Sequence, residues 1–182
     1  MLEMLVPPVR FMDLNEAKRH LRIEHGDADR EIMRLLPAAI AEFDGPEGRL
    51  LGRCLAPQTW RWTPEEHERS GSVLWLPLRP VIEVQPVLDQ AGEEIAVEAY
   101  TVLGINVSRG ARLDFKSGSF PEGGSVVFRA GYPTGFIPEP LRFAVLLMLG
   151  QLMSKGGEDV NASLVEDPTI ERLIHRFKVP IV

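Results

Sequence analysis

The strongest hydrophobic pattern in the chain lies in residues 141–154 and predicts a helix that is apolar on almost every side. Five apolar residues recur at helical spacing, namely Leu141, Val145, Met148, Leu149 and Leu152. The other sides add Phe143, Ala144, Leu146 and Leu147. A helix of this kind has to be buried on several sides at once. We therefore expect it to pack in its own domain and, through the five residues named first, against a neighbouring subunit.

A strand leads into this helix through a run of turn residues. Residues 126–128 are branched or aromatic, as is typical of strands. Gly131 interrupts the strand, and Pro138 and Pro140 bracket the start of the helix, where a missing backbone N–H costs nothing.

Two shorter amphipathic helices are predicted nearer the N-terminus, at residues 14–23 and 28–43. Asp13 precedes the first of them and is a suitable N-cap. Pro37 falls inside the second apolar pattern, where it removes one backbone hydrogen bond. The sequence therefore predicts a kink or a break near residues 33–36.

Between these helices and the long one, the hydrophobic period changes to that of β-structure. The candidate strands are residues 59–62, 73–78, 81–88, 95–97, 100–103, 111–115 and 125–129. Turn residues separate them, and no helical pattern intervenes, which favours antiparallel meander connections.

These elements together predict an α+β fold, in which a helical bundle carries an inserted antiparallel β module. Residues 1–56 and 133–155 are predicted to form the helical core, and residues 57–132 the β module. Residues 1–12 are expected to form an extended arm, because consecutive prolines at Pro7 and Pro8 disfavour helix. A flexible tail with one short amphipathic helix is expected at residues 156–182, after a polar Gly-Gly hinge.

The tail carries an apolar stripe that leaves two interpretations open. Ile170, Leu173, Ile174 and Phe177 fall on one face of the predicted helix, and the chain ends without a charged side chain. The segment either packs back on its own domain or docks in a groove of a partner protein. For docking, the contact residues would be Ile170, Leu173, Ile174, Phe177, Val179, Ile181 and Val182, with Arg172, Arg176 and Lys178 meeting acidic groups.

Composition narrows the class of protein. The chain has 182 residues, 45% of them hydrophobic, which suits one domain with an inserted module. Its longest apolar run, residues 143–149, is far below the roughly 18 residues that a membrane helix needs. Cys54 is the single cysteine, so no intrachain disulfide or cysteine-rich metal site is expected, and no secretory signal is visible. A net charge of −6 argues against a chain that binds nucleic acid by neutralising phosphates.

Candidate chemistry is sparse, and we expect neither catalytic nor cofactor-binding nor metal-binding residues. His20 and His25 are five residues apart and do not share a helical face as a metal pair would. Asp27 and Asp29 are explained by a helix N-cap and its first turn. Serine-hydrolase, zinc-protease and phosphate-loop motifs are missing from the sequence. An enzyme is therefore not expected.

Three tryptophans allow a different interpretation of the function. Trp60, Trp62 and Trp75 are spaced so that they can form an aromatic platform for sugars or bases. Trp60 and Trp62 fall on the same side of a predicted strand, which a sheet core also requires. The core interpretation is the favoured one.

An ordered set of short motifs resembles one family. From about residue 5 to residue 154 the set runs Pro7-Pro8, Leu14-x-Glu16-Ala17-Lys18-x-x-Leu21-Arg22-Ile23, Asp27 with Asp29, Gly52-Arg53, Pro57-Gln58-Thr59-Trp60, Leu76-Pro77-Leu78-Arg79-Pro80-Val81, Ala130-Gly131-Tyr132 and Ile137-Pro138-Glu139-Pro140-Leu141. In this order the motifs resemble the head–tail connector, or adaptor, proteins of long-tailed bacteriophages and gene transfer agents, in their longer form with a β insertion. The chain departs from the pattern at Pro37, at residues 47–51 and after the long helix.

The resemblance implies a structural virion protein without catalytic residues. Such proteins form a ring, usually of twelve subunits, under the portal at one capsid vertex, and double-stranded DNA passes through the ring without sequence-specific binding. The other face of the ring receives the stopper or next tail protein. The particle would assemble in the bacterial cytoplasm, with no membrane partner. The resemblance does not fix the role of the tail at residues 156–182, and we predict from its hinge and apolar stripe that it is the portal-docking element. The alternatives are a carbohydrate- or ligand-binding β module with helical flanks and, less favoured, a small hydrolase.

Overall fold

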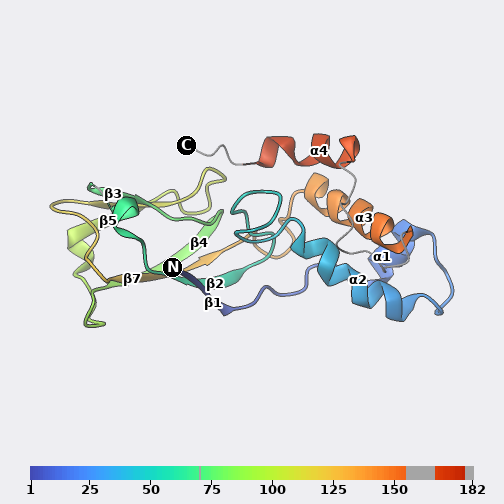
Figure 1. Cartoon of the computed structure of the whole chain (residues 1–182), viewed down its shortest axis with the longest axis horizontal. Coiled ribbons are helices and arrows are strands. Elements are labelled where there is room, and N and C mark those ends of the chain that lie inside the picture. The colour runs from blue at the N-terminus through green and yellow to red at the C-terminus, as the bar shows by residue number, and fades with distance from the viewer. Residues whose placement is uncertain (70, 155–166, 179–182) are drawn as a thin grey trace. The chain divides into compact units, whose positions relative to one another are not determined.

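The computed structural model describes residues 1–69, 71–154 and 167–178, and the fold is α+β, as predicted. The chain divides into two compact units (Figure 1). The first, here called the β unit, comprises Met1–Val9 and Cys54–Thr134. The second, the helical unit, comprises Arg10–Arg53 and Gly135–Val182.

The β unit contains two antiparallel sheets. One has the strand order β1 (Leu2–Val6), β2 (Gln58–Trp62), β7 (Ser125–Ala130) and β4 (Val81–Leu88). The other has the order β3 (Val73–Trp75), β6 (Arg112–Phe115) and β5 (Tyr100–Leu103), and two short 3₁₀ turns, η1 (Glu66–Arg69) and η2 (Val97–Ala99), complete the described elements. The predicted meander is therefore only partly correct, because β7 lies between β2 and β4. Four of its six side chains are buried, and a strand so buried needs a neighbour on each side.

Alternating side chains from both sheets make one hydrophobic core in the β unit. Trp60, Trp62 and Phe128 from the larger sheet join Leu74 and Leu113 from the smaller one in the same buried cluster. This confirms that the pair of tryptophans on β2 serves the core, since the strand buries every second side chain.

Gly131 explains why the chain needs glycine directly after β7. Its φ is +128°, and a Cβ atom at this position would lie 2.1 Å from the carbonyl oxygen of Ala56. Any side chain here would therefore force two backbone segments apart.

The N-terminal residues differ from their sequence-based assignment to the helical core. Leu2–Val6 form β1 and pair with β2, with Leu2 opposite Trp62 and Met4 opposite Trp60. Pro7 and Pro8 end the strand, since proline supplies no N–H to a ladder. The extended conformation was predictable, but its strand partner was not.

The helical unit contains α1 (Leu14–Leu21), α2 (Asp29–Ala41), α3 (Glu139–Ser154) and α4 (Pro168–Ile174), followed by the turn η3 (His175–Phe177). Asp13 caps α1 as predicted, because its side chain accepts the backbone N–H of Glu16 at 2.7 Å. Of the predicted kink or break near residues 33–36, the break is wrong, since α2 runs on through Pro37. Pro37 and Met33 both lie on the exposed side, where water can take the place of the lost hydrogen bond.

The long helix α3 is the centre of the helical unit, where it contacts α1, α2 and α4. The five residues predicted for a subunit interface are at most 2% exposed, namely Leu141, Val145, Met148, Leu149 and Leu152. They pack among the chain's own helices, so the all-round apolar character is used within one subunit. Phe143, at 43% exposed, is the large apolar side chain that α3 leaves open.

Replacing Val145 by aspartate tests the role of α3. Val145 is fully buried, so the variant loses about 1.5–3 kcal/mol of apolar burial and adds the larger cost of burying a charge. We expect Val145→Asp to unfold the helical unit, as measured by chemical denaturation followed by circular dichroism. Ser154→Asp, on an exposed position of the same helix, should change the free energy of unfolding by less than about 1 kcal/mol. Equal stability of the two variants would contradict the central position of α3.

Candidate functional site

The acidic and histidine side chains near the first helices do not converge on one site, and Asp27 does not cap α2 as predicted, because the N-cap is Ala28 and receives no side-chain hydrogen bond. Asp29 forms an ion pair with Lys18 at 2.5 Å, which joins α2 to α1. His25 lies 3.7 Å from Asp27, and both side chains are strongly exposed. His20 packs edge-on against the ring of Phe143. Among the described residues, no group of three or more His, Cys, Asp or Glu side chains could hold a metal ion.

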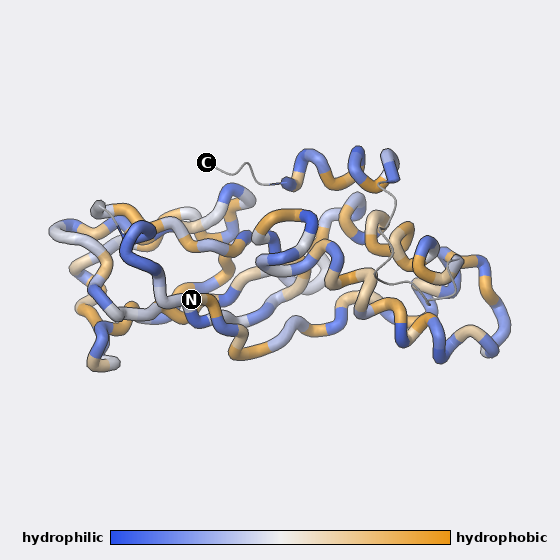
Figure 2. Tube along the Cα trace, viewed as in Figure 1, coloured by the Kyte–Doolittle hydropathy of each residue, from blue (hydrophilic) through white to orange (hydrophobic). Residues whose placement is uncertain are grey.

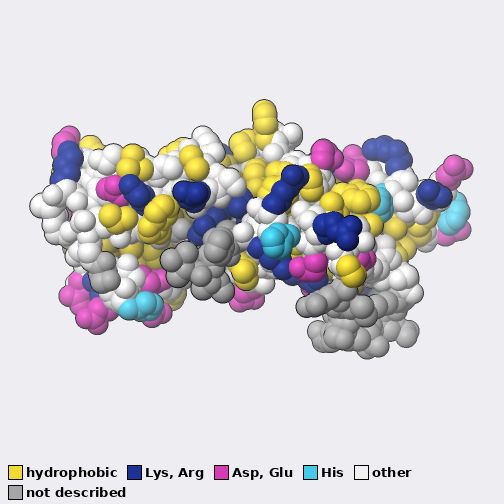
Figure 3. Space-filling view, turned by 90° about the horizontal axis from the view of Figure 1, so that it is seen from above, with side chains coloured by type: hydrophobic (Ala, Val, Ile, Leu, Met, Phe, Trp, Pro, Cys, Tyr) yellow, Lys and Arg dark blue, Asp and Glu magenta, His cyan; other side chains and the backbone are white. Residues whose placement is uncertain are grey.

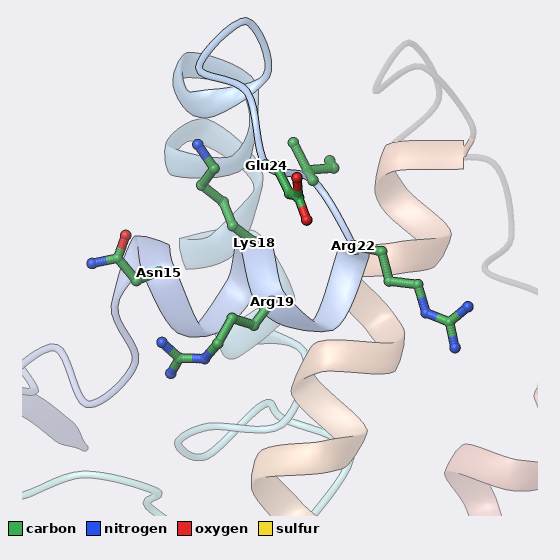
Figure 4. Close-up of a pocket in the computed structure, with 6 residues that line it drawn as sticks. Asn15, Lys18, Arg19, Arg22 and Glu24 are labelled. Atoms are coloured by element: carbon green, nitrogen blue, oxygen red, sulfur yellow. The ribbon is translucent and has the colours of Figure 1, made fainter.

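The hollow beside α1 does not form a converging site. Asn15, Lys18, Arg19, Arg22, Ile23 and Glu24 line it. Figure 4 shows Arg19 and Arg22 pointing in different directions, while Lys18 extends along a third. An anion site needs several donors aimed at one point, and this arrangement does not provide it.

The aromatic platform of the alternative interpretation is not assembled. Trp60 and Trp62 are 6% and 4% exposed, and the Trp60 indole donates a hydrogen bond to the side-chain oxygen of Gln58 at 3.1 Å. Trp75 alone of the three is accessible, and the Arg112 guanidinium lies over its ring, 5.3 Å from the centroid. The three tryptophans therefore cannot stack together on one ligand.

Trp75 belongs to a shallow depression on the smaller sheet, which also contains Leu103, Val107, Arg109 and Arg112. On the face seen in Figure 3, hydrophobic and basic side chains lie next to one another over the strands at the left of the view. Asp114 already forms an ion pair with Arg112 at 3.0 Å. The depression is thus a surface with mixed character rather than an enclosed pocket.

The C-terminal helix packs on its own unit. Ile170 and Ile174 are fully buried, and α4 contacts α3. Figure 2 shows the hydrophobic side of α4 turned towards α3. The sequence left open whether this segment packs on its own domain or docks in a partner protein, and in the structure it packs on its own domain. Neither isoleucine can therefore contact a partner while α4 stays in place.

The other predicted docking residues differ in accessibility. Arg172 and Arg176 are exposed, whereas Leu173, Phe177 and Lys178 are half-buried. Lys178 forms an ion pair with Glu171 at 2.6 Å, and the Arg176 guanidinium lies over the ring of Phe177. Val179, Ile181, Val182 and the Gly-Gly hinge lie outside the described residues.

Polar contacts fix both ends of the C-terminal segment. At its start, Asp167 accepts the backbone N–H of Thr169 at 2.7 Å and the side-chain amide of Gln151 at 2.8 Å. At its end, the buried Arg53 donates from Nε to the carbonyl oxygen of Phe177 at 3.0 Å. The cap at Asp167 was readable from the sequence, but the partners on α3 and at Arg53 were not, since they are distant along the chain.

Sequence reasoning also missed a group of exposed apolar residues near the N-terminus. Met4, Leu5, Val6 and Val9 are 45%, 38%, 53% and 65% exposed. The sequence shows these residues as an apolar run ahead of Pro7. Such a run is normally assigned to the core, so its exposure was not predicted.

No protein-family model and no curated protein matches the chain. Several solved structures, in contrast, are similar to it. The chain is similar along its whole length to a protein in the neck of an empty gene transfer agent (GTA) particle computed with sixfold symmetry, with 25% identity and a TM-score of 0.76. The alignment covers 100% of this chain and 97% of the other.

Two further structures agree with this likeness. One is the virion of a native GTA particle, with 25% identity, a TM-score of 0.75 and coverage of 100% and 97%. The other is the neck of a native GTA particle computed with twelvefold symmetry, which shares the fold at 23% identity, a TM-score of 0.70 and coverage of 98% and 97%. These neighbours are components of GTA virions, which is consistent with a structural role.

Shortening a buried side chain of α4 tests whether this helix is packed in solution. Ile174→Ala should lower the free energy of unfolding by about 2–5 kcal/mol, because it leaves a cavity against α3. Arg172→Ala, on the exposed side of the same helix, should change it by no more than about 0.5 kcal/mol. Thermal denaturation, with hydrogen exchange of residues 168–178, measures both. An unchanged stability of Ile174→Ala would mean that α4 is not docked.

Acidification should weaken the cap of α4. The backbone N–H of Thr169 holds the pKa of Asp167 below its usual value of 3.8, and the Gln151 amide adds to this effect. Because the folded-state pKa is the lower one, the stabilisation is present above the unfolded pKa and is lost as the pH falls through the folded one. The Thr169 amide resonance, followed by NMR, should titrate with a midpoint below 3.8.

Asp167→Asn is the matched control, because asparagine also caps helices but does not titrate. It should abolish the transition. A midpoint at or above the usual value would contradict the capping geometry.

Proposed function

We propose that this chain is a head–tail connector protein of a gene transfer agent or a related phage-like particle. The observation that carries the proposal is the likeness to proteins of GTA necks and virions, which extends over the whole chain at 25% identity. It includes both units and the C-terminal segment, so the likeness is to a complete architecture rather than to a shared motif.

In this proposal, the protein forms a ring of copies, twelve in number, under the portal at one capsid vertex. The opposite face receives a stopper or the next tail protein. Double-stranded DNA passes through the ring without sequence-specific contacts, and the net charge of −6 suits a wall to which DNA does not adhere. Assembly takes place in the bacterial cytoplasm.

Contact with the portal is assigned to the accessible side of the C-terminal segment. Arg172 and Arg176 are exposed there, next to the half-buried Leu173 and Phe177. Such a surface fits an acidic rim with an apolar centre. Ile170 and Ile174 support the contact from behind by holding α4 on α3.

The ligand-binding alternative has weaker support, since two of its three tryptophans are buried. A hydrolase has no supporting observation, since the sequence lacks the motifs of serine hydrolases and zinc proteases.

Deleting the gene for this protein tests the proposed function. Producing cells should then yield DNA-filled or leaking heads without tails, counted by electron microscopy, and expression of the intact chain should restore tailed particles. As a control for the portal contact, the double variant Arg172→Glu with Arg176→Glu should fold normally yet restore fewer tailed particles. Normal tails in the deletion strain would refute the proposal.

A further inference from the structure

The larger sheet has one edge that the described chain leaves open. In the order β1-β2-β7-β4, strand β1 pairs on one side with β2, and no described strand lies on its other side. Figure 1 shows β1 at the margin of the sheet, beyond β2. An open edge presents backbone donors and acceptors to which another strand can pair.

The hydrogen-bond alternation identifies which groups face outwards. Met1 and Thr63 form a hydrogen-bonded pair, since the terminal ammonium of Met1 donates to the carbonyl oxygen of Thr63 at 2.5 Å and the N–H of Thr63 donates to that of Met1 at 2.9 Å. In an antiparallel ladder such pairs alternate with pairs that do not bond to each other. Glu3 therefore bonds inwards to Arg61, whereas Leu2 and Met4 direct their N–H and C=O groups to the open edge.

The side chains along this edge are apolar and accessible. Met4, Leu5 and Val6 are 45%, 38% and 53% exposed, and Val9 follows at 65%. Proteins that remain monomeric usually protect an edge strand with lysine, an inward charge or a covering segment. Here the strand carries one charge, Glu3, which is paired with Arg61 at 3.4 Å.

The opposite edge of the same sheet is protected by the chain itself. Strand β4 contains Pro86 and two register shifts. Its carbonyl groups at Val81 and Val87 accept the backbone N–H groups of Asn106 at 2.7 Å and Ile95 at 2.8 Å. Strand β4 thus combines two register shifts with a proline and a covering loop, whereas β1 has one register shift, between Met4 and Val6, and no described segment covers its outer edge.

We infer that the open edge of β1 is a docking site for an extended segment of a neighbouring copy of this chain. The inference rests on the proposed function, because the neck structure at 25% identity is a symmetric assembly in which copies repeat around an axis. In a cyclic ring, each contact joins two different surfaces of the same protein. The segment that adds to β1 therefore comes from a surface other than the neighbour's own β1, and it binds by strand addition, with Met4 and Val6 supplying apolar contact.

Site-specific photo-crosslinking in assembled particles tests this inference. Benzoylphenylalanine replaces Met4, and after illumination the particles are separated on a denaturing gel and the adducts are mapped by mass spectrometry. We expect an adduct of two copies of this chain, in which position 4 is joined to a segment other than β1. The same probe at Val97, which is 62% exposed elsewhere in the β unit, should give at least tenfold less of that adduct.

An adduct within one copy, an adduct of β1 with β1, an adduct with a different protein, or equal yields at both positions would overturn the inference. The proposed function is refuted by a different result, namely tailed particles that form without this chain. Particles that contain the chain but crosslink elsewhere refute only the assignment of the edge.

A backbone variant provides an independent measurement. Met4→Pro removes an N–H that faces outwards, so the ladder with β2 keeps its hydrogen bonds. Met4→Ala shortens the same side chain but keeps the N–H. With unchanged circular dichroism, Met4→Pro should reduce the yield of tailed particles at least tenfold, and by more than Met4→Ala does. Equal yields from the two variants would mean that no strand is added at this edge.

Discussion

Burial of α3 among three other helices is the interaction on which the helical unit depends. The helix contacts α1, α2 and α4, and seven of its side chains are buried. Burying a large aliphatic side chain contributes about 1.5–3 kcal/mol, so α3 gains more from burial than any other helix among the described residues of this unit. The ion pair of Arg142 on α3 with Glu16 on α1 helps to set the orientation of these two helices.

This packing leaves α3 with little to offer a neighbouring subunit. The two surfaces that we propose for assembly, the outer edge of β1 and the exposed side of α4, are ones that the core does not use. In the proposed ring, such contact surfaces could vary independently of the packing that keeps the subunit folded.

Several polar side chains of the described residues stabilise the fold. Asp13 and Asp167 cap helices, Lys18 with Asp29 joins two helices, and Arg53 closes the C-terminal segment. Each of these groups either forms a hydrogen bond with a backbone group or balances a charge. Such partners offset the free-energy cost of removing polar groups from water. This structural use of polar groups is consistent with the likeness to virion components.

The sequence alone determined the local elements and the character of each. Helical spacing identified α3, Asp13 and Asp167 marked helix starts, and the alternation around Trp60 and Trp62 assigned them to the core. Tertiary structure decided what each apolar surface meets. An apolar stripe on α3 or α4 predicts only that these side chains avoid water, and it does not predict what they pack against. In the structure they pack against other helices of the same chain. The pairing of β1 with β2 was equally hidden, because strand partners are set by contacts between residues far apart in sequence, and those contacts leave no periodic trace in either segment.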